Sequence, residues 1–122
     1  MEVFRLSKKA YANLSGRGSA LKGGRWNSVG VEVIYTSANR ALAATELLVH
    51  LTSIPANYVI LQIFVPDTIS LMRINIPALP SSWLDFPPTP QTQIFGNNFV
   101  AENKHCVLQV PSAVVPGELT IY

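Results

Sequence analysis

Hydrophobic and polar residues alternate in short blocks along this chain, and this pattern predicts a domain built mainly of β-strands. Six segments are rich in β-branched and other apolar residues, and most are bounded by turn-forming residues, which is typical of strands. They are residues 3–6, 31–37, 58–65, 69–74, 106–110 and 113–115. We expect the third and fourth to be joined around Pro66–Asp67.

One segment has the composition of a helix that is buried on nearly every side. Alanine and leucine dominate residues 40–52, Asn39 is placed to cap the first turn, and Pro55 follows the last turn. Glu46 is the only charged residue between positions 41 and 66. The sequence therefore predicts an α+β domain with a mostly β core and one buried helix that carries a glutamate.

The remaining stretches are predicted to be loops. Residues 15–24 are rich in glycine and serine, and residues 77–90 contain five prolines, with room for a short turn at 81–84. Residues 92–102 fit neither a helical nor a strand pattern clearly. We find no repeat, and 122 residues are enough for one core, so we expect a single domain over residues 1–122.

Composition narrows the class of protein. Hydrophobic residues make up 48% of the chain and charged residues 13%, which excludes disorder over most of it. Cys106 is the single cysteine and cannot form an internal disulfide, which fits a reducing compartment. The first residues show no signal-peptide pattern, and no apolar run has the length and purity of a membrane span. We expect a cytoplasmic protein that does not contact a membrane.

Basic residues gather near the N-terminus. Residues 3 to 31 contain no acidic side chain, and their cations are Arg5, Lys8, Lys9, Arg17, Lys22 and Arg25. The cluster favours an anion-binding surface, with a solvated basic face as the alternative. Neither the phosphate-loop motif nor the dinucleotide fingerprint is present, since the latter would need glycine at Leu21. Few aromatic residues lie among the cations, so we expect no direct nucleic-acid contact.

Glu46 and His50 are the first candidates for chemistry. A carboxylate in apolar surroundings either pairs with an arginine for structure or lines a pocket, and both alternatives stay open. His50 lies one helical turn after Glu46. A zinc site built on this pair would need His105 or Cys106 as a third ligand, so we expect no metal.

Three further residues are candidates for a binding pocket. Arg25 follows Gly23–Gly24 and is placed to fork onto a phosphate or carboxylate, with an ordinary turn and a surface arginine as the alternative. Tyr35 lies in an apolar stretch, where a core position is the alternative to ligand contact. Ser112 lacks the glycine-flanked elbow of hydrolase nucleophiles, which leaves a pocket or loop serine.

Several of these stretches match one known family in the order in which that family has them. They are Leu14–Ser15–Gly16 with Gly18, Gly23–Gly24–Arg25–Trp26–Asn27–Ser28–Val29–Gly30, Ile34–Tyr35–Thr36–Ser37, the run from Ala41 to His50, and Val110–Pro111–Ser112–Ala113–Val114–Val115–Pro116–Gly117–Glu118. Through them the chain resembles the RES domain family over nearly its whole length. RES proteins are toxins paired with Xre-type antitoxins, so the resemblance implies such a partner, a fold related to ADP-ribosyltransferases and an activity on NAD.

The resemblance also implies roles for five residues. Arg5 and Arg25 would hold NAD, Tyr35 would pack on the nicotinamide side, Glu46 would be the key carboxylate, and Ser112 would complete the pocket. The implied reaction cleaves the bond between nicotinamide and ribose, and passes ADP-ribose to water, phosphate or a protein. Such a cleavage needs no metal, because nicotinamide is a good leaving group.

The chain departs from the family pattern in two places. Residues 96–99 read Gly-Asn-Asn-Phe, where the family has glycine and aspartate before a tryptophan. The sequence ends at residues 119–122, where the family continues through an asparagine-containing segment to a His-Pro pair. We therefore expect a shortened C-terminus with weaker strand support behind Ser112. The alternative to an enzyme is a non-catalytic domain that binds NAD or an antitoxin.

Overall fold

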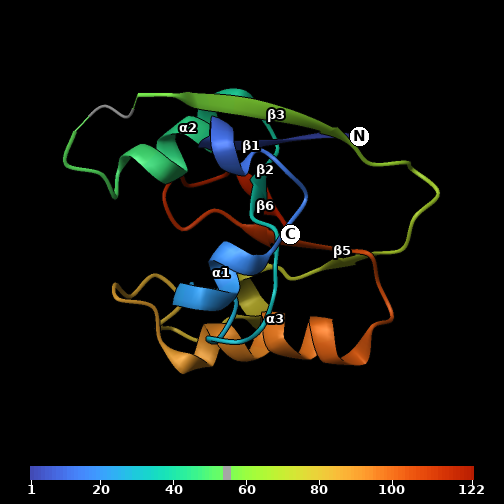
Figure 1. The fold of residues 1–122 in the computed structure, drawn as a ribbon. Helices are drawn as coiled ribbons and strands as arrows, with labels where there is room; N and C mark the ends of the chain where they lie inside the picture. Colours follow the sequence, from blue (N-terminus) through green and yellow to red (C-terminus); the bar gives the residue numbers. More distant parts are fainter. Residues whose placement is uncertain (54–55) are drawn as a thin grey trace.

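Six strands form one sheet in the computed structural model, which describes residues 1–53 and 56–122 (Figure 1). The strands are β1 (Glu2–Lys8), β2 (Thr36–Ser37), β3 (Tyr58–Phe64), β4 (Leu71–Arg73), β5 (Val107–Pro111) and β6 (Leu119–Ile121). Their order across the sheet is β3-β1-β2-β6-β5-β4, and every neighbouring pair is antiparallel except β4 and β5. Together with the three α-helices among these described residues, this sheet confirms the predicted α+β class.

Strand β6 lies inside the sheet, between β2 and β5. Thr120 pairs with Ser37 on one side and with Val110 on the other. Just beyond the end of β5, the backbone N–H of Ser112 donates to the carbonyl of Glu118 at 2.9 Å. The expectation that strand support is missing behind Ser112 is therefore wrong. The pattern missed β6 because three residues are too few to show an alternation.

The segment around Gly16 is structured, although we predicted residues 15–24 to be a flexible loop. It contains helix α1 (Arg17–Lys22). The Ser19 hydroxyl donates to the carbonyl of Val33 at 2.5 Å and accepts from the Val33 N–H at 3.1 Å. A Cβ at Gly16 would lie 2.8 Å from the Val33 nitrogen, so this glycine permits a close approach between segments.

Two of the predicted strands, residues 31–37 and 113–115, are wrong in whole or in part. Of residues 31–37 only the last two form a strand, because Val33 bonds to α1 instead of a neighbouring strand. Residues 113–115 form a bend rather than a strand. There the Ser112 hydroxyl accepts the N–H groups of Val114 and Val115, which draws the chain into a turn.

Helix α2 (Arg40–Leu48) begins as predicted and ends earlier than predicted. The Asn39 side chain caps it by accepting the Leu42 N–H at 2.8 Å. Only Leu42 and Ala43 are buried along the helix, because α2 covers one side of the sheet and its other face meets solvent. The prediction of a helix buried on nearly every side is therefore wrong. Pro55, expected to stop the helix, lies outside the described residues.

Helix α3 (Pro90–Glu102) occupies the stretch that fitted no pattern, and in Figure 1 it runs along the side of the molecule opposite α2. The prolines before it form a loop with a 3₁₀ turn at Ile76–Ala78 and the expected turn at residues 81–84. Within the part of the chain that the structure describes, no helix is long and apolar enough to cross a membrane.

The sheet buries apolar side chains on both faces. Val107 belongs to one cluster with Val3, and its neighbour Leu108 belongs to another with Trp26, because successive strand residues point to opposite faces. In the second cluster the rings of Trp26 and Phe95 meet edge to face, with centroids 6.4 Å apart. This contact joins α3 to the Gly-Gly-Arg-Trp-Asn turn.

One face of α3 packs against that turn through Gln93 and, one helical turn later, Gly96 and Asn97. The Gln93 amide donates to the carbonyl of Gly24 at 3.0 Å. The Asn97 side chain accepts the N–H of Ser28 at 2.9 Å and donates to its hydroxyl at 2.7 Å. Between them Gly96 faces the Trp26 carbonyl directly, since a Cβ there would lie 1.6 Å from that oxygen. The asparagine that departs from the family pattern is thus a structural contact here.

Substituting Gly96 with alanine should destabilise the protein strongly. The added methyl group meets backbone atoms of Trp26, which move only if the helix separates from the turn. We expect a loss of at least about 2 kcal/mol in the free energy of unfolding, measured by urea denaturation.

Gly18→Ala is the matched control, because nothing lies within 4 Å of a Cβ at this position in α1. It should leave the free energy of unfolding unchanged or raise it by up to about 1 kcal/mol. Equal losses in the two variants would show that the close approach of α3 does not limit stability.

Candidate active site

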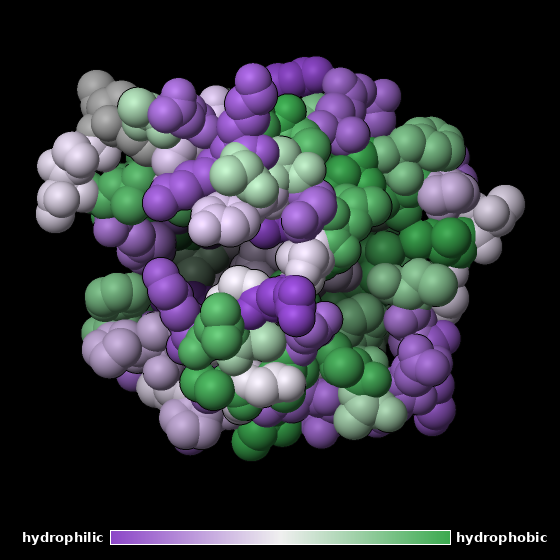
Figure 2. All heavy atoms as spheres, in the orientation of Figure 1, coloured by the Kyte–Doolittle hydropathy of each residue, from purple (hydrophilic) through white to green (hydrophobic). Residues whose placement is uncertain are grey.

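A cavity of about 680 Å³ has the sheet and α2 on one side, and α1 and the proline-rich loop on the other. Figure 2 shows the surface hollowed there, between α2 above and the loop before α3 below. The volume is in the range of cofactor and small-molecule sites. Four of the five predicted site residues line it, namely Arg5, Arg25, Tyr35 and Glu46. The fifth, Ser112, is bonded to one of them.

Glu46 is held in position by the buried Ser112, which is 3% exposed. The Ser112 hydroxyl donates to Oε1 of Glu46 at 2.6 Å and accepts two N–H groups, from Val114 at 3.1 Å and Val115 at 3.0 Å. Its donor and both lone pairs are therefore engaged. The arrangement fixes one carboxylate oxygen of Glu46 and leaves Ser112 no further hydrogen bond to offer.

The sequence left open whether Glu46 pairs with an arginine or lines a pocket. Within the described residues, one ion pair is formed, between the N-terminal amine of Met1 and Asp67 at 3.1 Å. Glu46 lines the cavity instead, without a cation at salt-bridge distance among those residues. No cation of the described residues thus occupies the carboxylate, which faces the cavity.

Arg25 is anchored to the proline-rich loop across the cavity. Its Nη1 donates to the carbonyls of Trp83 at 2.6 Å and Asp85 at 2.9 Å. Before it, Gly23 has a φ of 70°, and a Cβ on Gly24 would lie 2.6 Å from the Tyr35 hydroxyl. Both glycines are thus required by the turn that presents Arg25. The guanidinium has a fixed position and further N–H groups available.

Arg5 reaches the same cavity from β1. Its Nη1 donates to the carbonyls of Asn13 at 2.7 Å and Ser15 at 3.3 Å. Partial burial lowers the pKa of Arg5, although a guanidinium remains a cation at neutral pH. Lys22 also lines the cavity, so part of the basic cluster faces one hollow. The side chains of the other clustered lysines, Lys8 and Lys9, are exposed outside it.

Tyr35 is both a core residue and a cavity residue. Its hydroxyl donates to Oδ1 of Asn27 at 2.5 Å and accepts the Trp26 N–H at 3.1 Å. Burial raises the pKa of Tyr35 to about 12, so the hydroxyl stays protonated and keeps donating. Its ring packs on that of Tyr122, with centroids 4.4 Å apart. Burial also raises the pKa of Tyr122 above its usual value.

Sequence reasoning missed Tyr122 and Phe86, which border the cavity together with the candidate His50. Tyr122 follows β6, and we did not predict that strand because it is only three residues long. Phe86 lies in a loop with no periodicity. A long loop rich in proline that carries two aromatic residues was the available signal, because such loops often carry function.

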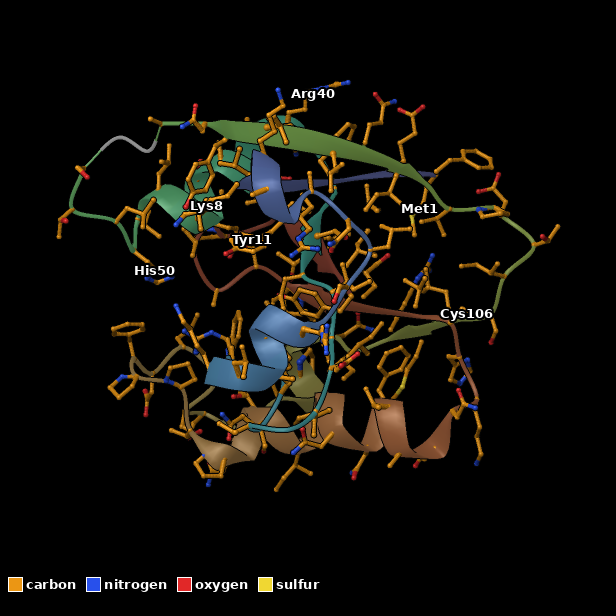
Figure 3. The ribbon with its side chains drawn as sticks, in the orientation of Figure 1. Met1, Lys8, Tyr11, Arg40, His50 and Cys106 are labelled. Carbon is orange, nitrogen blue, oxygen red and sulfur yellow. The ribbon has the colours of Figure 1, made fainter. Side chains whose placement is uncertain are left out.

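The four residues considered for zinc are not together. His50 and Glu46 border this cavity, whereas His105 and Cys106 border a second one of about 440 Å³. Figure 3 shows His50 and Cys106 at opposite ends of the molecule. Across residues 1–53 and 56–122, no group of three or more histidine, cysteine, aspartate or glutamate side chains could hold a metal ion.

Known proteins resemble this chain along most of its length. A relative from a Sphingobium species, named Prs ADP-ribosylating toxin, is 39% identical over 114 residues, which cover 89% of this chain and 70% of the relative. A Pseudomonas putida protein named Toxin Res is 37% identical over 121 residues, covering 96% of this chain and 79% of the relative. A Photorhabdus laumondii protein of the same name is 32% identical over 122 residues, covering 97% and 78%.

The family itself follows from a match to the whole domain. The sequence model described as the RES domain matches residues 2–122, which span every strand and helix of the structure. Together with these identities, the match shows that the chain belongs to the RES domain family.

Proposed function

We propose that this chain is an enzymatic toxin that breaks the bond between nicotinamide and ribose in NAD. The observation that carries the proposal is the carboxylate of Glu46, oriented by Ser112 and facing a cavity that two arginines also line. The names of the relatives support the biological role, since two are called Toxin Res and one is called Prs ADP-ribosylating toxin.

The cations suit the central part of NAD. Its pyrophosphate carries two negative charges, and guanidinium groups bind phosphate oxygens through paired N–H donors. Arg5 and Arg25 each use Nη1 to bond backbone carbonyls, which leaves the rest of each guanidinium for the ligand. We assign the pyrophosphate to these two residues.

The carboxylate suits the bond that breaks. The C1′–N bond cleaves with its electron pair leaving on the nicotinamide nitrogen, which neutralises that ring and makes it a good leaving group. Positive charge develops on the ribose, as in glycoside cleavage. Glu46 is placed to stabilise this charge or to hold a ribose hydroxyl, and a cavity of low polarity strengthens both effects. Ser112 acts as its positioning residue.

The acceptor of ADP-ribose is water, phosphate or a protein side chain. The name of the Sphingobium relative favours transfer to a protein. We further propose that an Xre-type antitoxin controls the toxin and that both act in the cytoplasm, where NAD is abundant. An alternative is a non-catalytic domain that binds NAD or the antitoxin, for which the test below provides a distinct outcome.

Incubating the pure protein with NAD and following free nicotinamide by chromatography tests the proposal. Parallel reactions contain buffer alone, inorganic phosphate, or a lysate of a host cell with labelled NAD. We expect nicotinamide release in at least one of them, and the ADP-ribose product identifies the acceptor. Binding of NAD without release in any reaction would establish the non-catalytic alternative.

Glu46→Gln should abolish NAD turnover while the protein stays folded. The amide has nearly the same shape and still accepts the Ser112 hydrogen bond, but it carries no charge to stabilise the ribosyl cation. We expect a loss of roughly a thousandfold in kcat, measured by nicotinamide release. Glu102→Gln, at the exposed end of α3, is the matched control and should retain activity. Wild-type turnover by Glu46→Gln would make Glu46 structural.

Ser112→Ala should lower kcat through Glu46 and leave KM nearly unchanged. We expect a loss of about ten- to a hundredfold, because the carboxylate loses its orienting donor. In a Glu46→Gln background the same change should have little further effect, since the two residues act as one unit. Fully additive losses would show instead that Ser112 contacts NAD by itself. A parallel thermal melt separates this effect from lost stability.

Arg25→Lys should weaken NAD turnover even though the charge is kept. An ammonium cannot bond the carbonyls of Trp83 and Asp85 while also forking onto a phosphate. We expect kcat/KM to fall at least about tenfold, which corresponds to about 1.4 kcal/mol. Arg17→Lys, an exposed position outside the cavity lining, is the control. Equal constants for both variants would reduce Arg25 to a surface charge.

A further inference from the structure

Two aromatic rings from different parts of the chain stack at one side of the cavity. The imidazole of His50 and the ring of Phe86 have centroids 5.4 Å apart and planes inclined by 14°. His50 follows the end of α2, and Figure 3 shows it pointing toward the loop that precedes α3. Both residues line the cavity of about 680 Å³. The stack therefore bridges the two sides of the hollow.

The ring of Phe86 is not a core residue. It is 73% exposed, so it contributes little buried area to the fold. Its neighbour Asp85 is nevertheless fixed, because the Asp85 carbonyl accepts from Arg25 at 2.9 Å and that of Trp83 accepts at 2.6 Å. An anchored segment thus presents a flat apolar face at a solvent-exposed edge of the cavity, where a ligand ring would bury it.

We propose that the His50–Phe86 stack binds the adenine base of the dinucleotide, an inference that rests on NAD being the substrate. Glu46, where the ribosyl bond would break, is bonded to the buried Ser112. The nicotinamide end therefore occupies the inner part of the cavity, beside Tyr35. The adenine is at the other end of NAD from the nicotinamide and needs a second flat surface, which the exposed stack supplies.

The chemistry of the stack suits an adenine. A base stacked on an aromatic side chain gains about 1–3 kcal/mol without hydrogen-bond readout of its edge. Arg25 links the two subsites, because the guanidinium assigned to the pyrophosphate also anchors the segment before Phe86. The stack thus acts as a specificity determinant for dinucleotides, away from the reacting bond.

Comparing NAD with nicotinamide mononucleotide tests the adenine contact, since the mononucleotide keeps the bond that breaks and lacks the adenosine monophosphate half. Phe86→Ala should raise the KM for NAD by roughly 5- to 150-fold, with kcat/KM for the mononucleotide changed less than about twofold. His50→Ala should act in the same direction, and Phe86→Tyr, which keeps the ring, should restore NAD binding. Phe64→Ala removes a phenylalanine of nearly the same exposure, 72%, outside the cavity and serves as the control.

Equal losses with NAD and the mononucleotide, or no loss with NAD, would overturn the proposal. Calorimetric binding of ADP, which carries the base and pyrophosphate but no scissile bond, gives a second measurement independent of turnover. Weaker ADP binding by Phe86→Ala than by Phe64→Ala supports the adenine site, and equal binding or none by the native protein refutes it. Should the native protein release no nicotinamide from either substrate, the proposed function fails, while the ADP measurement still decides the adenine site.

Discussion

The buried side chain of Asn27 is the contact on which most of the candidate site depends. It is fully buried, and its Nδ2 donates to the carbonyls of Ser19 and Val31, each at 2.9 Å. Its Oδ1 accepts the hydroxyl of Tyr35. One amide thereby joins α1, the turn that carries Arg25 and the approach to β2. Because a buried amide must satisfy all its polar atoms, this connection defines a single arrangement of these segments.

Close approach of backbones adds a second constraint on the same turn. Gly24 leaves room for the Tyr35 hydroxyl, and Gly96 lets α3 meet the carbonyl of Trp26. The turn is therefore packed from two sides, and the guanidinium that it carries is not a mobile surface group. This explains in physical terms why Gly-Gly-Arg-Trp-Asn is a specific motif, since each residue of the turn contacts a different neighbour.

The sequence predicted what depends on local chemistry and missed what depends on distant contacts. Asn39 caps α2 as expected. For Glu46 the sequence left two alternatives open, an arginine partner or a pocket, and the structure has the carboxylate lining a cavity. Helix α1 and strand β6 were missed, since each is too short for periodicity and is held by partners far along the chain. The position of Phe86 beside the cavity depends on the path of the proline-rich loop, which no local sequence pattern predicts.

Three charged groups of the cavity, Glu46, Arg5 and Arg25, are oriented by hydrogen bonds to neutral groups. A hydroxyl holds Glu46, and backbone carbonyls hold Arg5 and Arg25. Had the glutamate paired with an arginine, each charge would have cancelled the other, and a ligand would have had to break the pair before binding. Dipoles fix the positions of these groups without neutralising them, so both signs of charge remain available at separate places in one cavity. The proposed substrate, an extended molecule with anionic phosphates and a sugar that becomes cationic in the reaction, requires that separation.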